Sequence, residues 1–495
     1  MISASQLYDF VHCPMRVYLD AHGDPARRDK PSAFTQMLWK QGVAHEERMV
    51  PTLGVTADIT RFPEAQREAE TLAAMKRGEA LIYGGRISAG RLVGVPDLLE
   101  RRTQGYIPGD LKSGSGLDGD EDDGKLKRHY AYQLAHYARI LEDMGLSDGS
   151  RESFIIDREG TRTTYPMNAA QGVKTPATWW DAYHGALDEV EALVAGTPSR
   201  GAISSKCKQC EWKSHCREEL EAADDLTLIP ELGRSKRNAI AEIIPTMREL
   251  AAIDPEDFIK VKKTVFKGIG PDTLRTFHAR AVLLTTRDAT PYIKEAVSLP
   301  ERAREVFFDI EDDPLTGMCY LHGFVERPHG NPRDERYVPF FAVGESAADE
   351  RAAFEEAWAY LQARRTDSAI YYYSSYEKGA YRRLAKRHPA VCSVEDVEGL
   401  FAEAGMVDLY SSVVKTKTEW PLNDHSIKTI ASYLGFKWRD TNPSGAASIE
   451  WYHSFKDAAN PLEKARIKQR ILDYNEDDCR ATGVVLGGIR RLPVR

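Results

Sequence analysis

The stretch LVGVPDLLERRTQGYIPGDLK, residues 92–112, decides the fold of the N-terminal part of this chain. Two β-like runs flank a polar turn, and each carries an aspartate, Asp97 and Asp110. Because side chains at positions i and i+2 of a strand share a face, Asp110 and Lys112 point the same way. If the two strands pair as a hairpin, Asp97 lies beside them. Two carboxylates then form a hard-oxygen site for Mg²⁺ or Mn²⁺, with a lysine next to it.

This arrangement suits metal-assisted hydrolysis of a phosphodiester. The lysine would position or deprotonate the attacking water and stabilise charge on the phosphate. Residues 126–144 have apolar side chains at helical spacing, and Gln133 and Tyr137 share one face of that predicted helix. Upstream, His45 lies in another predicted helix and could supply a nitrogen ligand. Each piece alone also fits a surface ion pair or an ordinary helix face.

The order GxxxH, GxPD, DxK and QxxxY resembles the RecB-type branch of the PD-(D/E)xK nucleases at every motif position. That resemblance implies a restriction-endonuclease-like fold for this part of the chain. It implies that Asp97, Asp110 and His45 bind the metal and that Lys112 is the catalytic lysine. Gln133 and Tyr137 would contact the substrate or organise the site.

Four cysteines mark the two ends of the same region. Cys207, Cys210 and Cys216 form a Cys-x2-Cys-x5-Cys cluster, and Cys13 stands near the start of the chain. Thiolates at this spacing could bind Zn²⁺ or an iron–sulfur cluster. The pattern is similar to that of AddB-type and CRISPR-associated nucleases, which implies a structural [4Fe–4S] cluster, and zinc stays open by ligand chemistry. The remaining cysteines are predicted core thiols: Cys319, Cys392 and Cys479.

A second group of acidic residues lies in the C-terminal part. Asp309 and Glu311 stand in the strand-like run VFFDIE and face one side. Tyr474 and Asp478, four residues apart, share one face of a predicted helix. Two acids from a strand and one from a helix can converge on a pair of divalent ions, and the tyrosine hydroxyl can orient the attacking water. Separately, each run also fits an acidic strand end or a solvated helix.

These residues resemble the DEDD exonucleases of the RNase H-like superfamily, in the Tyr-x3-Asp subgroup and especially the YprB-type domain. The runs YYYSSYEKGAYRRL and LNDHSIKTIASYLGF support the resemblance. It implies that Asp309, Glu311 and Asp478 bind metal and that Tyr474 orients the water. Most such enzymes have aspartate where this chain has Glu377. The resemblance makes Glu377 a metal ligand that differs from the family's usual residue, and Asp408 is a candidate substitute.

The segment between these regions is locally basic. Residues 231–290 hold 11 Lys+Arg against 8 Asp+Glu, a balance of +3 in a chain whose net charge is −8. Lys267–Gly270 followed by a predicted helix resembles a helix-hairpin-helix element, with LIPELGRSKRNAI, residues 228–240, as a degenerate copy. Glycines let a backbone approach a phosphate, so we expect contact with duplex DNA, although an ordinary tight turn fits as well.

The length of 495 residues predicts about three domains. We expect an α/β multidomain protein with a nuclease domain at 1–220, a helical segment at 221–295 and an RNase H-like domain at 296–495. Forty-two per cent apolar and 29% charged residues are typical of a globular protein. No apolar run is long enough for a membrane span and no signal peptide is evident, so we expect a cytoplasmic protein. The acidic run 118–124 is a predicted solvated loop.

Together these features resemble the RecB-like nucleases that join an iron–sulfur PD-(D/E)xK domain to an RNase H-like exonuclease domain. The resemblance implies a metal-dependent DNA nuclease in repair, recombination or defence, acting as an exonuclease on single-stranded or end-containing DNA. A second reading is an RNA-processing 3′–5′ exonuclease that uses the C-terminal domain. A third is a scaffold with one or both sites inactive that recruits a separate helicase.

Overall fold

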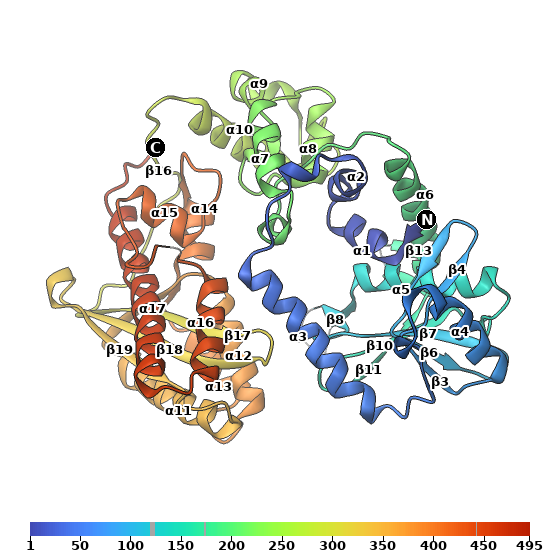
Figure 1. The fold of residues 1–495 in the computed structure, drawn as a ribbon. Coiled ribbons are helices and arrows are strands. Elements are labelled where there is room, and N and C mark those ends of the chain that lie inside the picture. Colours follow the sequence, from blue (N-terminus) through green and yellow to red (C-terminus); the bar gives the residue numbers. More distant parts are fainter. Residues whose placement is uncertain (119–123, 173–174, 442) are drawn as a thin grey trace. The chain divides into compact units, whose positions relative to one another are not determined.

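The computed structural model describes residues 1–118, 124–172, 175–441 and 443–495 (Figure 1). These residues form two compact units, Met1–Glu219 and Leu220–Arg495. Most of the acidic run at 118–124, residues 119–123, lies outside the described residues. Among the described helices, none is long and apolar enough to cross a membrane.

A six-stranded sheet forms the centre of the first unit, in the order β11-β10-β7-β6-β3-β2. Strands β6 and β7 pair antiparallel with Leu98 opposite Gly109, as expected for the hairpin. Gly109 has to be a glycine, because a Cβ there would lie 2.3 Å from the ring of Phe154 on β10. The strands are β2 (Ala57–Asp58), β3 (Leu81–Tyr83), β6 (Leu98–Arg101), β7 (Tyr106–Leu111), β10 (Glu152–Ile156) and β11 (Arg162–Pro166).

Helix α5 (Arg128–Asp143) packs on β7 and carries the QxxxY residues. Its apolar side chains, including Leu134 and Ile140, are fully buried, which explains the helical spacing in the sequence. Other helices of this unit are α1 (Ala4–His12), α2 (Pro14–His22), α3 (Ala33–Met49), α4 (Glu64–Arg77) and α6 (Trp179–Val194), and the boundary between the two units falls within α7 (Lys213–Ala222). Short strands are β1 (Ile2–Ser3), β4 (Ile87–Ala89), β5 (Leu92–Gly94), β8 (Leu117–Asp118), β9 (Lys125–Leu126), β12 (Ala170–Gly172) and β13 (Thr175–Thr178).

A five-stranded mixed sheet forms the centre of the second unit, in the order β19-β18-β17-β20-β21. Strand β17 pairs antiparallel with β18 and parallel with β20. Because side chains alternate along β17, Phe308 faces one layer of helices and Asp309 the other. The strands are β17 (Arg304–Asp313), β18 (Met318–Pro328), β19 (Arg336–Phe341), β20 (Ser368–Tyr372) and β21 (Met406–Asp408).

Helices cover both faces of this sheet. Apolar side chains of α11 (Ala347–Arg364), α12 (Tyr376–Arg387) and α13 (Val394–Phe401) pack on the face that carries Phe308. The long helix α17 (Pro461–Ile489) lies across the other face beside α16 (Gly445–Asp457), as Figure 1 shows. Helix α15 (Ile427–Tyr433) packs against α17.

Residues 221–295 belong to the second unit. They form α8 (Gly233–Ala241), α9 (Met247–Ala252), a hairpin of β14 (Ile259–Lys260) and β15 (Lys263–Thr264), α10 (Pro271–Thr285) and β16 (Tyr292–Ile293), which pairs with β22 (Thr418–Glu419). Arg280 of α10 is fully buried and binds Glu419 at 2.8 Å and Glu231 at 3.1 Å. Since an unpaired buried charge is costly, these ion pairs hold α10 in one place.

Candidate active sites

The first unit brings Asp97, Asp110 and Lys112 together. Asp97 directly precedes β6, and its Oδ2 accepts a hydrogen bond of 2.8 Å from the amide of Leu111 on β7. The amide of Asp97 in turn lies 3.3 Å from Asp110 Oδ1. Lys112 Nζ forms an ion pair of 2.6 Å with Asp110 Oδ2. The hairpin register thus places two carboxylates and an ammonium group at one point.

Electrostatics at this point favour a bound cation. Burial and the neighbouring charge of Asp110 raise the pKa of Asp97 well above its ordinary value. Burial opposes the charged form of Lys112, but the carboxylates of Asp110 and Asp97 outweigh it and raise the pKa of the lysine. When both aspartates are ionised, the site carries two negative charges and the single positive charge of Lys112. One negative charge is then left without a partner. A divalent cation would stabilise that state.

Gln133 and Tyr137 support the turn that carries Asp97. Gln133 Nε2 donates a hydrogen bond of 3.1 Å to Tyr137 Oη, which donates one of 3.3 Å to the carbonyl of Val95. A Cβ on Gly94 would lie 2.6 Å from the Tyr137 ring, so this close approach requires glycine. Burial, followed by the charges of Asp110 and Asp97, raises the pKa of Tyr137. The tyrosine therefore lies beside the acidic pair and stays neutral.

His45 and its neighbour Glu46 on α3 differ in their surroundings. His45 is buried; after burial itself, the charges that act on it come from Arg48, Asp157 and Glu159, and its Nε2 has no hydrogen-bond partner among the described residues. By contrast, Lys112 and Asp110 act on Glu46, whose pKa is raised mainly by burial. The structure thus associates Glu46 with the acidic pair, a residue that the motif pattern did not select. The role of His45 as a ligand remains a prediction.

The second unit brings three acids of the C-terminal constellation together. Asp309 and Glu311 of β17 and Asp478 of α17 each offer a carboxylate oxygen within 4.8 Å of the others. Burial and the charges of Glu311 and Asp478 raise the pKa of Asp309 well above its ordinary value. Burial and Asp478 raise the pKa of Glu311 to about 8. Three acids this close repel one another, and their donor set fits a hard divalent cation.

Tyr474 and Asp478 both contact Lys428 of α15. Lys428 Nζ donates hydrogen bonds of 2.9 Å to Tyr474 Oη and of 2.9 and 3.1 Å to the carboxylate of Asp478. Trp438 Nε1 donates another, of 2.6 Å, to Asp478 Oδ1. Neither Lys428 nor Trp438 was selected from the sequence. Lys428 lies 46 residues before Tyr474, so no short sequence motif could have predicted that the two side chains are in contact.

Glu377 is the second residue of α12, the helix that follows β20, and it is buried. Its charge acts on Asp309, and burial raises its own pKa to about 8. Asp408 at the end of β21 also acts on Glu377. Glutamate at the second motif therefore reaches the acidic group electrostatically, although its oxygens are not part of the three-acid cluster.

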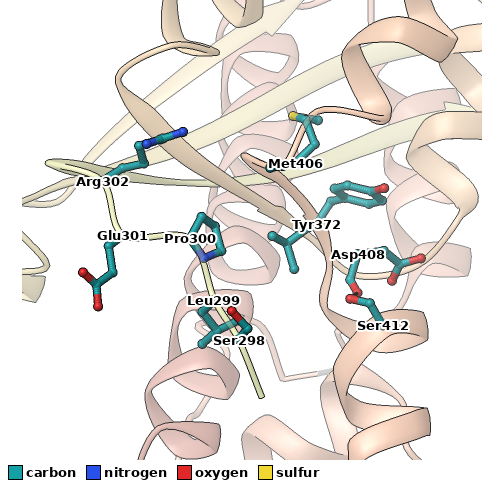
Figure 2. Close-up of a pocket in the computed structure, with 11 residues that line it drawn as sticks. Ser298, Leu299, Pro300, Glu301, Arg302, Tyr372, Met406, Asp408 and Ser412 are labelled. Carbon is teal, nitrogen blue, oxygen red and sulfur yellow. Dashed lines mark hydrogen bonds between the residues drawn. The ribbon is translucent and has the colours of Figure 1, made fainter. Parts of the chain in front are cut away.

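Asp408 itself lines a different hollow, of about 590 Å³. Figure 2 shows it between the segment Ser298–Arg302 and three further residues: Tyr372 of β20, Met406 of β21 and Ser412, which follows β21. None of the three clustered acids lines this hollow. The hollow is therefore separate from the three-acid cluster.

The four cysteines of the first unit lie near one another. Burial, then the sulfurs of Cys13, Cys210 and Cys207, raise the pKa of the Cys216 thiol to about 12. Trp212 packs among three of these cysteines, and its amide lies 3.4 Å from Cys210 Sγ. In the described part of the chain these cysteines do not form a group of three or more potential ligands within 4.8 Å of one another, so the [4Fe–4S] cluster stays a prediction. Cys319, Cys392 and Cys479 are buried, as the sequence predicts for core thiols.

Comparison with known families agrees with this geometry. Residues 21–217 match the family model of the PD-(D/E)XK nuclease superfamily, and residues 306–487 match that of the RNase_H superfamily. No curated protein matches the chain. The first match includes the Asp97–Asp110–Lys112 site and the second the three-acid cluster, which supports a nuclease and implies that it binds nucleic acid. The chain joins a domain of the PD-(D/E)XK nuclease superfamily to a domain of the RNase H superfamily.

Proposed function

We propose that the protein is a Mg²⁺- or Mn²⁺-dependent DNA nuclease with two hydrolytic sites. The observation that carries the proposal is the convergence of carboxylates at each site on one point: Asp97 with Asp110, and Asp309 with Glu311 and Asp478. A bound divalent cation would lower the pKa of a water molecule and stabilise charge on the phosphate oxygens. The proposed substrate is single-stranded or end-containing DNA.

At the first site, Asp97 and Asp110 would hold the cation, and the charge of Glu46 acts on Asp97. Lys112, held 2.6 Å from Asp110, would stabilise negative charge on the phosphate and position or deprotonate the attacking water. Tyr137 and Gln133 keep the Asp97 turn in place from α5.

At the second site, Asp309, Glu311 and Asp478 would hold the cation, and Glu377 is a further candidate ligand. Tyr474 would orient the attacking water through its hydroxyl, which Lys428 fixes by a hydrogen bond. The Tyr-x3-Asp spacing supports a DEDD exonuclease of the YprB type, which implies trimming from the 3′ end. The raised pKa of Tyr474, due mainly to burial, keeps the hydroxyl neutral at this site.

The remaining parts of the proposal concern the cysteines and the cellular role. A [4Fe–4S] cluster on Cys13, Cys207, Cys210 and Cys216 would join the two ends of the first unit and stabilise its fold, with zinc as the alternative. Anaerobic purification followed by iron and sulfide analysis and an absorbance spectrum tests this assignment. Iron near four atoms per chain, lost in Cys216→Ser, supports the cluster, whereas stoichiometric zinc contradicts it. DNA repair, recombination or defence in the cytoplasm is the proposed setting.

One gel series tests the nuclease proposal. End-labelled single- and double-stranded DNA and matching RNA are incubated with Mg²⁺ or Mn²⁺ and with wild type, Lys112→Ala, Asp309→Ala or the double variant. We expect DNA cleavage that Lys112→Ala reduces strongly and the double variant abolishes. Cleavage of RNA alone, lost in Asp309→Ala, favours the RNA-processing alternative. Absence of metal-dependent cleavage by wild type overturns the proposal and favours a scaffold that recruits a separate helicase.

A further inference from the structure

The hairpin of β14 and β15 presents a cluster of lysines to solvent. Residues 260–267 hold four lysines and no acidic residue. All four are exposed, and in the described part of the chain none forms an ion pair or a side-chain hydrogen bond. They are Lys260, Lys262, Lys263 and Lys267. We call residues 259–267 the lysine hairpin. Positive charge left unpaired on a chain of net charge −8 indicates a surface for an anionic partner.

Val261 at the tip of the lysine hairpin is unusual in two respects. Its side chain is 95% exposed, and its φ of +59° lies in the left-handed region, which β-branched residues rarely adopt. Asparagine or glycine would occupy this position with less strain. A strained backbone that holds an apolar side chain out into water, with lysines on both sides, suggests that this side chain has a binding role.

Side-chain packing and a hydrogen bond hold the base of the lysine hairpin in place. Phe258 and Phe266 stack at its base with ring centroids 5.6 Å apart, and Thr264 Oγ1 donates a hydrogen bond of 2.6 Å to the carbonyl of Ile269. Residues 262–270 line a hollow of about 400 Å³ beside the start of α10. Because Arg280 fixes α10 through buried ion pairs, the lysines are presented from a rigid support.

We propose that the lysine hairpin binds duplex nucleic acid, with its lysines on backbone phosphates and Val261 inserted against the base steps. Phosphates repeated along a duplex match four lysines on one short hairpin. One exposed apolar side chain is too small for a protein interface, which buries about 800 Å² per partner, but suits a wedge between stacked bases. The inference rests on the proposed nuclease function and adds a contact outside both catalytic sites.

Fluorescence anisotropy of the full chain with a labelled duplex of about 20 base pairs, in EDTA and over a salt series, tests the inference. Each lost phosphate contact reduces the slope of log K against log salt by about 0.9, so Lys262→Gln/Lys263→Gln reduces it by about 1.8. Val261→Asn weakens binding at least about fivefold, leaves the slope unchanged and raises the melting temperature, because it relieves strain.

Arg287→Gln is the control, because Arg287 is also exposed but follows the far end of the 15-residue α10, about 22 Å from its start. We expect this variant to behave like wild type. An unchanged slope in the double lysine variant, an equal loss in Arg287→Gln, or binding of poly-glutamate as tight as that of the duplex overturns the inference. If wild type still cleaves DNA in those cases, the nuclease proposal stands. If wild type neither binds nor cleaves, both fail.

Discussion

Replacement of Lys428 by methionine tests how the second site is poised for metal. Lys428 Nζ lies 2.9 Å from Asp478 Oδ1, and at an effective dielectric constant of about 20 the attraction is roughly 6 kcal/mol. Desolvation offsets most of this attraction, and the lysine side chain is 30% exposed, so the net contribution is about 1–2 kcal/mol. We therefore expect Lys428→Met to lower the free energy of unfolding of the metal-free protein by that amount.

The same substitution should strengthen metal binding, because the ammonium occupies the carboxylate of Asp478 and repels a cation. A gain of about 1.4 kcal/mol corresponds to tenfold tighter binding of Mn²⁺. Calorimetric titration and the metal-induced shift in melting temperature measure this effect. Lys437→Met, at an exposed lysine with no ion pair among the described residues, is the matched control. Unchanged or weaker Mn²⁺ binding in Lys428→Met would refute the reasoning.

Three further predictions concern other parts of the molecule. Burial and the neighbouring Asp478 raise the folded-state pKa of Glu311 from about 4.5 to about 8, so the metal-free protein binds more protons folded than unfolded. Its stability should fall as pH rises through that range, and urea unfolding should show a flatter dependence in Glu311→Gln. In Gly94→Ala the new Cβ meets the Tyr137 ring, which we expect to cost about 1–3 kcal/mol and to reduce cleavage at the first site; wild-type kinetics would contradict this. Arg280→Met leaves the buried Glu419 with Lys294 as its cation. We expect the free energy of unfolding, measured by thermal unfolding, to fall by about 3–5 kcal/mol. A fall below about 1 kcal/mol would show that the ion pairs do not anchor α10.

Local patterns predicted most of the fold. The alternation along VFFDIE and the hydrophobic spacing of residues 126–144 correspond to β17 and α5, because burial on one face leaves a regular trace in the sequence. The β14–β15 hairpin leaves no such trace, because each of its strands is only two residues long and its side chains are mostly exposed.

The sites were predictable only in part. Residues in short motifs, such as Asp110 and Lys112, lie close together because strand geometry fixes their distance. Lys428 contacts the second site through tertiary packing of α15, and the charge of Glu46 on α3 acts on the first, and no spacing rule encodes either. Of the charged neighbours of His45, Arg48 lies on the same helix, whereas Asp157 and Glu159 come from the segment after β10, far from it in sequence.

The most direct test of the account is the release of labelled nucleotides from DNA by the Lys112→Ala/Asp309→Ala double variant beside wild type, both in Mn²⁺. Our account predicts metal-dependent cleavage by wild type and its complete loss in the double variant, with both proteins folded by circular dichroism. Equal cleavage by the two proteins would contradict it, because the chemistry would then come from neither acidic site.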